Sequence, residues 1–366
     1  MFPPSRQPSG LRRDRTACLS TLAGLLACAA LSGTQAYGAG TVVLYTPGGF
    51  EDLYKDVLPS FEAKEGVKVT IVSGGSGELV DRVRTEKDSP KADVVMTTPP
   101  FIQAAAADHL LQPIHLDSDA HMVAGNVAPD GTWRTFIDDY VCFGVNPEEV
   151  SILPTTFDHL LRPDLAGKVA YSNPATAGDG MALVILVITA FGSEDAGFGY
   201  LKQLEDSVRF HTRGTGYLDV LLNDGEIAVA NGDLVMDLAD AAGGGLSIEP
   251  IFLSLKEGDP PLTFSLPTAM GLVAHGPNGA LGQKLIEYLL TKEVQAKLAM
   301  IYGIPARDDI PPDSPNAQVV RNIIDGVRVL PVDWINVGLK KEAWLKRFKD
   351  EVIGDSGKPV SVVAPK

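Results

Sequence analysis

Clusters of metal-binding and nucleophilic residues are scarce in this sequence. Its six histidines are scattered, and none shares a metal-binding spacing with another. No GxxxxGK[ST] phosphate loop occurs, so nucleotide hydrolysis is not indicated. The stretch Gly74–Glu78 has the start of a GxSxG nucleophile elbow but lacks its closing glycine. We therefore expect no enzymatic activity, no cofactor and no resident metal. The acidic pair Asp138-Asp139 is interpreted as surface or hinge charge.

Positive charge is also in short supply. Lys and Arg number 31 against 46 Asp and Glu, which gives a net charge of −15 and a pI near 4.8. Nucleic-acid binding needs clustered Lys and Arg, so this balance argues against a nucleic-acid partner. The 366 residues, 45% of them hydrophobic, suffice for two domain cores and are typical of a soluble monomer.

The N-terminus differs from the rest of the chain. Four arginines between Arg6 and Arg15 precede the uncharged, Ala- and Leu-rich run 17–32, and Ala36-Tyr37-Gly38 offers small residues at the signal-peptidase spacing. The run is short for a membrane span, so residues 1–39 are interpreted as a secretory signal peptide, cleaved after Gly38 or Ala39. A buried N-terminal helix is the alternative. Export would place the mature protein in the periplasm.

Cysteine is nearly absent. Of the three cysteines, Cys18 and Cys28 would leave with the signal peptide, so Cys142 would stand alone and form no intrachain disulfide. A single Cys in an apolar run is most often a small core residue. The sequence Leu26-Ala27-Cys28 weakly resembles a lipoprotein acylation site, and a lipid anchor at Cys28 is a minor alternative.

What the chain does contain is alternating strand and helix patterns. Apolar residues from Phe50 to Phe61 recur at helical spacing, and they follow a short apolar strand at Val42–Tyr45. A strand at 67–71, a helix at 77–86, a strand at Asp93–Met96 and a helix from Pro100 to Leu111 continue the pattern. This order predicts a parallel sheet covered by helices, and hence an α/β fold.

A second unit of the same kind begins with the strand Tyr140–Val145. Further strands and helices are predicted up to residue 241, and then the chain returns through strands at 262–266 and 271–274 to helices at 281–290, 293–301 and 334–352. We predict two lobes, each a mixed, mostly parallel sheet covered by helices. Residues 41–138 with about 258–308 form the first lobe, and residues 139–257 with about 309–366 form the second. Hinges are expected near Asp139–Val141 and Leu253–Leu262, with a ligand cleft between the lobes.

Ligands of such sheets bind at the carboxyl ends of the strands. Four loops at these ends are rich in Gly, Ser and Thr: Thr46–Gly49, Ser73–Glu78, Thr97–Pro100 and Ser172–Gly180. Three of them run into helices, whose N-termini attract anions. Ordinary turn and capping chemistry explains any one of these loops, but four at equivalent positions favour a shared anion site.

The same region carries acids. Asp233 and Glu78 lie near loops that otherwise suit an anion, and a pocket with both features suits a zwitterion with an oxyanion and an ammonium group. Helix N-capping is an equally good explanation of Asp233.

These loops resemble a known family. The mature chain is similar to extracellular solute-binding proteins of the ferric-ion-binding type, and within these to the 2-aminoethylphosphonate-binding receptors. The resemblance covers residues 41–310, and its matching stretches are Val72–Glu78, Ala92–Gln103, Tyr171–Gly180 and Val229–Asp233.

The resemblance implies a two-lobed periplasmic receptor that closes on its ligand and docks onto an ABC permease of the inner membrane, with a cytoplasmic ATPase driving transport. The iron binders of the family use two adjacent tyrosines, which align near Asp233-Leu234 here, and Tyr217 has Leu218 beside it. Fe(III) prefers anionic oxygen ligands, so this departure favours a small phosphonate. Fe(III) or another small anion, such as a phosphate ester or thiamine, remains the alternative.

On this interpretation the helix starts at Gly77 and Gly180, with nearby hydroxyls, bind the phosphonate. Asp233, supported by Glu78 or Tyr140, holds the ammonium. The full set of expected ligand-binding residues is Tyr45, Thr46, Ser76, Gly77, Glu78, Thr97, Thr98, Tyr140, Ser172, Thr176, Asp179, Gly180, Thr215, Asn231 and Asp233.

Overall fold

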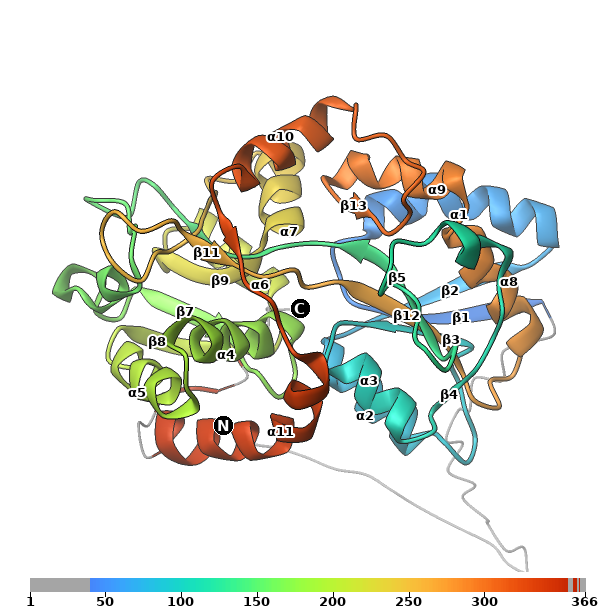
Figure 1. The fold of residues 1–366 in the computed structure, drawn as a ribbon, viewed down its shortest axis with the longest axis horizontal. Coiled ribbons are helices and arrows are strands. Elements are labelled where there is room, and N and C mark those ends of the chain that lie inside the picture. The colour runs from blue at the N-terminus through green and yellow to red at the C-terminus, as the bar shows by residue number, and fades with distance from the viewer. Residues whose placement is uncertain (1–39, 355–357, 361, 363–366) are drawn as a thin grey trace, which may run out of the picture. The chain divides into compact units, whose positions relative to one another are not determined.

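The computed structural model describes residues 40–354, 358–360 and 362. Its strands and helices alternate along the chain and gather into two sheets flanked by helices (Figure 1). The predicted α/β class is confirmed. The predicted signal peptide over residues 1–39, with Cys18 and Cys28, lies outside the described residues.

The first sheet is 7-stranded and is built mainly from the N-terminal part of the chain, with the order β13-β5-β12-β3-β1-β2 and with β4 beside β12. Its strands are β1 (Thr41–Thr46), β2 (Lys68–Ser73), β3 (Val94–Thr97), β4 (Leu111–Gln112), β5 (Trp133–Asp138), β12 (Thr268–Val273) and β13 (Ile304–Pro305). The accompanying α-helices are α1 (Glu51–Glu65), α2 (Ser76–Thr85), α3 (Phe101–Ala107), α8 (Gly279–Leu289) and α9 (Lys292–Lys297).

The second sheet is 5-stranded, with the order β10-β6-β9-β7-β8. Its strands are β6 (Val141–Val145), β7 (Val169–Ser172), β8 (Val208–Thr212), β9 (Val229–Asp233) and β10 (Glu249–Ile251). The helices that follow or cover them are α4 (Gly178–Phe191), α5 (Glu194–Leu204), α6 (Gly216–Asn223), α7 (Leu234–Ala239) and α11 (Trp334–Arg347). A small third sheet pairs β11 (Leu262–Thr263) with β14 (Arg328–Val329), and α10 (Pro315–Ile324) lies just before β14.

Both large sheets are mixed, but antiparallel pairing contributes more than the mostly parallel prediction allowed. In the first sheet β1 pairs in parallel with β2 and β3, whereas β12 runs antiparallel to β3, β4 and β5. In the second sheet β7 is parallel to β8 and β9, whereas β6 is antiparallel to β9 and β10. The antiparallel strands are those by which the chain crosses from one sheet to the other or returns, so they enter each sheet from the opposite end.

Most of the helices and strands that apolar periodicity predicted are present in the structure. The predicted apolar face of α1 is buried along its whole length. The helix predicted from Pro100 to Leu111 ends at Ala107, because His109 adopts a positive φ of 56° and Leu111 then joins β4. Ile71 remains 40% exposed because β2 is an edge strand with a partner on one side. Strand β5 and helix α5 were not predicted.

Two chain segments connect the large sheets side by side. Strand β5 ends at Asp138 and β6 begins at Val141, while β11 and β12 flank the segment 264–267. The two crossings hydrogen-bond to each other: Leu266 N donates to Asp139 O at 2.9 Å, and Thr263 Oγ1 donates to Val141 O at 2.7 Å. The second crossing thus lies just after the predicted range Leu253–Leu262. The exact lobe boundaries stay a prediction.

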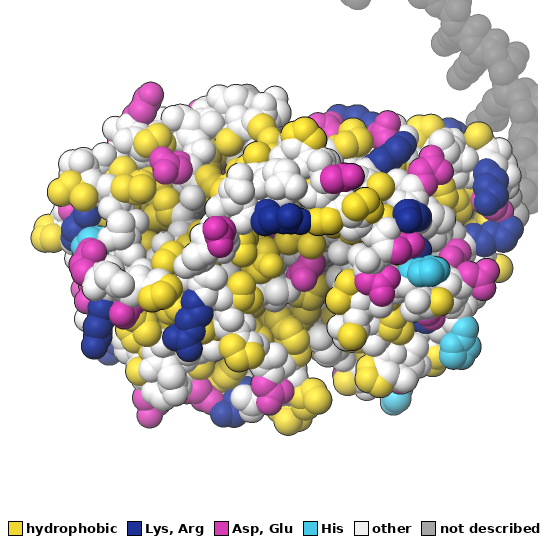
Figure 2. Space-filling model, turned by 45° about the horizontal axis from the view of Figure 1, so that its top comes forward, with side chains coloured by type: hydrophobic (Ala, Val, Ile, Leu, Met, Phe, Trp, Pro, Cys, Tyr) yellow, Lys and Arg dark blue, Asp and Glu magenta, His cyan; other side chains and the backbone are white. Residues whose placement is uncertain are grey.

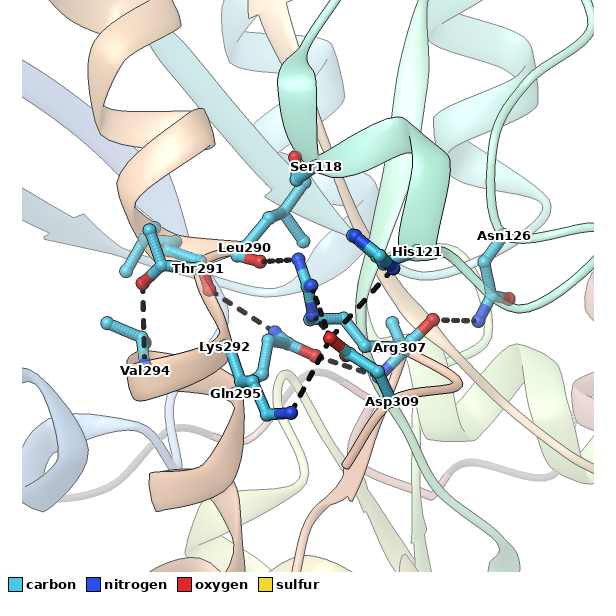
Figure 3. Close-up of polar contacts among 12 residues, drawn as sticks. Ser118, His121, Asn126, Leu290, Thr291, Lys292, Val294, Gln295, Arg307 and Asp309 are labelled. Atoms are coloured by element: carbon cyan, nitrogen blue, oxygen red, sulfur yellow. Dashed lines mark hydrogen bonds and ion pairs between the residues drawn. The ribbon is translucent and has the colours of Figure 1, made fainter. Parts of the chain in front are cut away.

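A buried polar network ties the segment after β13 to the first sheet (Figure 3). Gln295 is fully buried; its amide donates to Phe136 O at 2.9 Å and its carbonyl accepts from Ala306 N at 2.8 Å. Arg307 binds both carboxylate oxygens of Asp309, at 2.8 and 2.9 Å. The Gln295 contacts satisfy two buried backbone groups, each of which would cost about 1–3 kcal/mol if left unpaired.

On the face drawn in Figure 2, acidic and basic side chains are scattered among apolar and neutral ones and do not gather into one charged area. Cys142 is buried and free, as expected of a small core residue. Within the described part of the chain, no helix combines the length and apolar character needed to cross a bilayer.

Candidate functional site

A cavity of about 580 Å³ lies where strand-end loops of the two sheets face each other. From the first sheet it is lined by loops that follow β1, β2 and β3, and from the second sheet by loops that follow β7, β8 and β9. Asp139, Leu266 and Thr268, on or next to the crossing segments, complete the wall. The cavity therefore occupies the position that the sequence predicted, at the carboxyl ends of strands.

Six of the predicted ligand-binding residues line this cavity: Ser76, Glu78, Thr98, Asp179, Thr215 and Asp233. They come from different loops, so the fold assembles them from distant parts of the sequence. The other predicted residues lie behind the wall or elsewhere, and each has an identifiable partner or packing role.

Ser76 and Thr98 form the hydroxyl-bearing part of the wall. Thr98 Oγ1 donates to Ser76 Oγ at 3.2 Å, and Ser76 is the first residue of α2. Gly178, the first residue of α4, packs directly on this pair: a Cβ there would lie 2.5 Å from Thr98 Oγ1 and 2.9 Å from Ser76 Oγ. Two helix starts and two hydroxyls thus meet at one point, an arrangement suited to an oxyanion.

The same contact joins the loops of the two sheets. Gly77 N donates to Thr176 O at 3.1 Å, and a Cβ on Gly75 or Gly77 would lie within 2.3 Å of a carbonyl oxygen of the loop after β7. Gly77 was predicted to offer its N–H to a ligand, but in this structure Thr176 accepts it. Thr97, also predicted as a ligand contact, donates instead to Ser76 O at 3.1 Å.

Two further predicted residues, Ser172 and Asn231, hold Thr215 in position through hydrogen bonds. Ser172 N donates to Asn231 Oδ1 at 2.8 Å, because β7 and β9 are neighbours in the sheet. Thr215 Oγ1 in turn donates to Ser172 Oγ at 3.2 Å. Ser172 and Asn231 therefore hold Thr215 at the cavity wall and do not line it themselves. Gly180 also packs against this group. A Cβ on Gly180 would lie 2.3 Å from Ser172 O, so no side chain would fit there.

Tyr45, Thr46 and Tyr140 do not line this cavity, contrary to prediction. Tyr45 OH donates to Glu86 at 2.9 Å, and Thr46 Oγ1 lies 2.9 Å from Tyr54 OH. Both are buried, and their hydroxyls are engaged by helices α1 and α2. Tyr140 lines a separate cavity of about 330 Å³ beside α10.

Arg213 pairs with Glu78 at the cavity wall. Its guanidinium forms an ion pair and a hydrogen bond with the Glu78 carboxylate, which also accepts from Gly75 N at 3.2 Å. Glu78 belongs to α2, whereas Arg213 directly follows β8, so the pair bridges the loops of the two sheets. Glu78 was predicted to support an ammonium group, but here it already has a cationic partner. Arg213 itself was not predicted.

The remaining wall is acidic. Asp139, Asp179, Asp233 and Asp240 line the cavity, and the buried Asp219 and Asp237 lie behind them. The interpretation of Asp139 as a surface or hinge charge is therefore incomplete: it lies at a crossing, but it is buried and faces the cavity. Asp233 also caps α7, accepting from Met236 N at 2.8 Å, so the capping explanation is confirmed, while its role toward a ligand stays a prediction.

Burial and mutual repulsion shift the ionisation of these acids. Burial, with the charge of Asp233, raises the pKa of Asp179 to about 7 and raises that of Asp139 well above its ordinary range. Burial and the charge of Asp237 raise the pKa of Asp219 to about 10. Burial and repulsion therefore favour the neutral form of these carboxyl groups over the ionised form.

Sequence reasoning missed Asp139, Arg213, Tyr217 and Asp240 as cavity residues. Tyr217 carried a usable signal, since it lies two residues after Thr215, which was predicted to contact the ligand. Tyr217 is flanked by Gly216 and Leu218, so it forms no adjacent tyrosine pair. Among the residues whose positions are described, no group of three or more His, Cys, Asp or Glu is arranged to hold a metal ion.

Comparisons with known proteins agree with this architecture. A family profile described as bacterial extracellular solute-binding protein matches residues 42–300. A periplasmic protein of Salmonella paratyphi A, whose name provisionally assigns it 2-aminoethylphosphonate binding, is 33% identical over 340 residues, covering 90% of this chain and 97% of its own.

Solved structures share the fold at lower identity. The periplasmic binding protein AfuA of Actinobacillus pleuropneumoniae, solved with fructose-6-phosphate, superposes with a TM-score of 0.76 at 18% identity, covering 86% of this chain and 99% of its own. Apo ferric ion-binding protein A of Pasteurella haemolytica gives a TM-score of 0.68 at 20% identity, covering 85% and 98%.

Proposed function

Because this chain belongs to the family of bacterial extracellular solute-binding proteins, we propose that it binds a small aminophosphonate, such as 2-aminoethylphosphonate, in the cavity between its strand-end loops. Proteins of this family are receptors that bind small ligands, and those of this type work with ABC permeases. The ligand identity is the part that we add.

One observation supports this ligand above others: the cavity has two chemically different walls. Ser76, Thr98 and Thr215 offer hydroxyls beside the starts of α2 and α4, and Arg213 adds a cation nearby. The second wall is acidic and is formed by aspartates such as Asp139 and Asp233. An oxyanion is stabilised by the first wall and an ammonium group by the second, so a zwitterion with both groups satisfies the whole cavity.

The contacts that join the two sets of loops support capture by closure. Glu78–Arg213 and Gly77–Thr176 connect α2 to the second sheet, while the crossing segments at 138–141 and 264–267 connect the sheets on another side. Opening at the loop contacts with bending at the crossings would admit a ligand, as in other hinged binding proteins. In this proposal residues 1–39 direct export to the periplasm, and the closed receptor delivers its ligand to an inner-membrane permease without chemical change.

The alternative ligands, a phosphate ester and Fe(III), would interact differently with the acidic wall. A phosphate ester without an amine, such as the ligand of the AfuA structure, would leave the aspartates without a cationic partner. Fe(III) would use carboxylates, but Tyr217 has no adjacent tyrosine. The wall thus favours a ligand that carries its own positive charge.

Calorimetry of the purified mature protein tests the proposal. The ligands are 2-aminoethylphosphonate, ethylphosphonate, phosphate, fructose 6-phosphate, thiamine and Fe(III). We expect micromolar or tighter binding of 2-aminoethylphosphonate and at least about 100-fold weaker binding of ethylphosphonate, because removal of the amine removes the attraction between the ammonium group and the aspartates.

Tight binding of another ligand in this set, with none for 2-aminoethylphosphonate, would refute the ligand assignment. The same incubations, analysed for products after one night, address catalysis: we expect all ligands to be recovered unchanged.

A further inference from the structure

Two carboxyl groups in the cavity wall are in direct contact. The backbone amides that bind them are neighbours in the chain, Val235 N for Asp139 and Met236 N for Asp233, and the two carboxyl groups lie close enough to hydrogen-bond to each other. The pairing of β6 with β9 brings them together, because Val141 lies opposite Asp233 and Leu234 N donates to Tyr140 O at 2.9 Å. Two carboxyl groups form such a hydrogen bond only when one of them carries a proton. A hydrogen bond between these two carboxyl groups therefore requires that they share a proton.

The backbone holds this pair in place. Asp139 Oδ1 accepts from Tyr140 N at 2.6 Å and from Val235 N at 3.1 Å. Asp233 Oδ1 accepts from Met236 N at 2.8 Å. These bonds stabilise about one negative charge on the pair, and they would remain in place if the proton were lost.

Nearby groups disfavour a second charge. The ionisable side chains around the pair come from the crossing segment, β6, α4, α6, α7 and the turn after α7: Asp138, Tyr140, Cys142, Asp179, Asp219, Asp237 and Asp240. All of them are neutral or acidic. Arg213 lines the same cavity, but its guanidinium is paired with Glu78.

Independent evidence for missing positive charge comes from unpaired oxygens. Asp219 and Asp237 are at most 1% exposed, and Asp219 Oδ2 and Asp237 Oδ1 have no hydrogen-bond partner in the structure. Buried carboxyl oxygens are rarely left without a partner. Burial and repulsion accordingly raise the pKa of Asp139 and of Asp237. Among the described residues that line the cavity, Arg213 is the one cation and Glu78 already pairs with it, so protons are the remaining source of balancing charge.

We infer that the cavity takes up a cationic group in exchange for a proton: Asp139 and Asp233 share one proton in the ligand-free protein, and the ammonium group of the ligand displaces it. The proton leaves the carboxyl pair for a buffer base, and the pair then carries two negative charges against the ammonium. This inference deepens the proposed function, since it explains how the site distinguishes an amine-bearing ligand from an anion alone.

The proton exchange makes ligand affinity depend on pH. Because binding releases a proton, affinity for the amine-bearing ligand rises as pH increases towards the point at which the ligand-free pair loses its proton. A ligand without an amine leaves the proton in place, so its affinity lacks this contribution. Asp139 and Asp233 together are thus specificity-determining residues.

Calorimetry in two buffers of different ionisation enthalpy counts the released protons. We compare the wild type with Asp139→Asn, using 2-aminoethylphosphonate at one pH near neutrality. The asparagine keeps the acceptor for Tyr140 N and Val235 N and can donate to Asp233, but it has no proton to release. We expect the wild type to release nearly one proton more than the variant. Titration of the ligand's own phosphonate contributes equally to both. Equal proton counts would overturn the inference.

A ligand-free measurement separates this inference from the proposed function. The infrared difference spectrum between wild type and Asp139→Asn at neutral pH should contain a protonated-carboxyl band that belongs to the pair. If 2-aminoethylphosphonate fails to bind but the band is present, the ligand assignment fails and the shared proton stands. An absent band refutes the shared proton, whatever the ligand. Asp233→Asn serves as a second variant, because asparagine also caps a helix well and the fold of each protein is checked by circular dichroism.

Discussion

At the scale of single residues, glycine sets the geometry of the anion-binding wall. Gly178 begins α4 and approaches Thr98 and Ser76 more closely than any side chain would allow. Its φ is not positive, so the requirement is for space and not for an unusual backbone conformation. The glycine-rich loop after β7 therefore shapes the site by permitting contact between the loops of the two sheets.

Gly178→Ala tests this requirement. The added Cβ would lie 2.5 Å from Thr98 Oγ1, so Thr98 must turn away and lose its bond to Ser76. We expect ligand affinity to fall by about tenfold or more, since the loss of one or two well-placed hydrogen bonds costs on the order of 1–3 kcal/mol. Calorimetry with 2-aminoethylphosphonate measures the change.

Gly199→Ala is the matched control. It lies in α5, and a Cβ there meets nothing within 4 Å. Alanine in a helix interior is about 0.5–1 kcal/mol more favourable than glycine, so this variant should melt at a slightly higher temperature and bind as the wild type does. Unchanged affinity in Gly178→Ala would show that the contact with Thr98 is not needed for binding.

At the scale of elements, the sequence predicted what local periodicity determines. Helices α1, α2, α4 and α8 and strands such as β1, β3 and β6 carry apolar patterns that are readable within one segment. The loops at strand ends followed from the α/β architecture. Strand β5 was missed because it mixes charged and apolar residues, with Arg134 buried against Asp119 through a tertiary ion pair.

The missed site residues depended on pairing between distant strands. Asp139 becomes a cavity residue only when β6 lies beside β9, more than ninety positions later in the chain, and no local pattern encodes that contact. Arg213 reads as an ordinary surface cation until α2 supplies Glu78. Tyr45 was overpredicted because its strand was identified correctly but its hydroxyl partner, Glu86, was not.

The ion pair between α2 and the loop after β8 should act on ligand release. Glu78 and Arg213 are partly exposed, so their attraction is worth about 0.2–1 kcal/mol, or up to about a fivefold change in rate. We expect Glu78→Gln and Arg213→Gln each to speed dissociation of 2-aminoethylphosphonate. The double variant should release the ligand no faster than the single variant with the higher dissociation rate. Stopped-flow dissociation at low and high salt measures this coupling.

Arg209→Gln is the control for the ion-pair prediction, because Arg209 forms a comparable exposed pair with Glu226 within the second sheet and outside the cavity lining. Its dissociation rate should equal that of the wild type. Additive effects of the two single cavity variants would mean that Glu78 and Arg213 act separately and do not hold the loops together.

At the scale of the whole molecule, the acidic side chains of the two regions lie in different electrostatic environments. The exposed acids pair with Lys and Arg, as Asp309 does with Arg307, an interaction that lowers the pKa of Asp309 to about 2. Among the described residues, the buried Asp179, Asp219 and Asp237 pair with no Lys or Arg, and burial raises the pKa of each. Stability should therefore respond to pH in opposite directions in the two regions.

The buried acids decide the response above pH 5. Raised pKa values mean that the folded protein binds more protons than the unfolded chain, so stability is fully present below about pH 4 and is lost as pH rises through the folded pKa. For Asp179 the loss begins near pH 4 and is complete just above pH 7, whereas for Asp219 it continues to about pH 10. Asp309 acts oppositely: its contribution is lost only as pH falls from about 4 through about 2. We expect the free energy of unfolding of the ligand-free protein to decrease from about pH 6 to about pH 8.

Urea unfolding at these two pH values, followed by circular dichroism, measures the difference. Asp179→Asn is the matched variant: without a titrating group at this position, it should show a smaller decrease over the same interval. A saturating amine-bearing ligand should also flatten or reverse the trend, because its ammonium favours the deprotonated wall and its stabilisation grows as protons leave. A wild-type protein that becomes more stable from pH 6 to pH 8 without ligand would show that these carboxyl groups are already ionised in the folded state, and that the acidic wall is balanced by something other than protons.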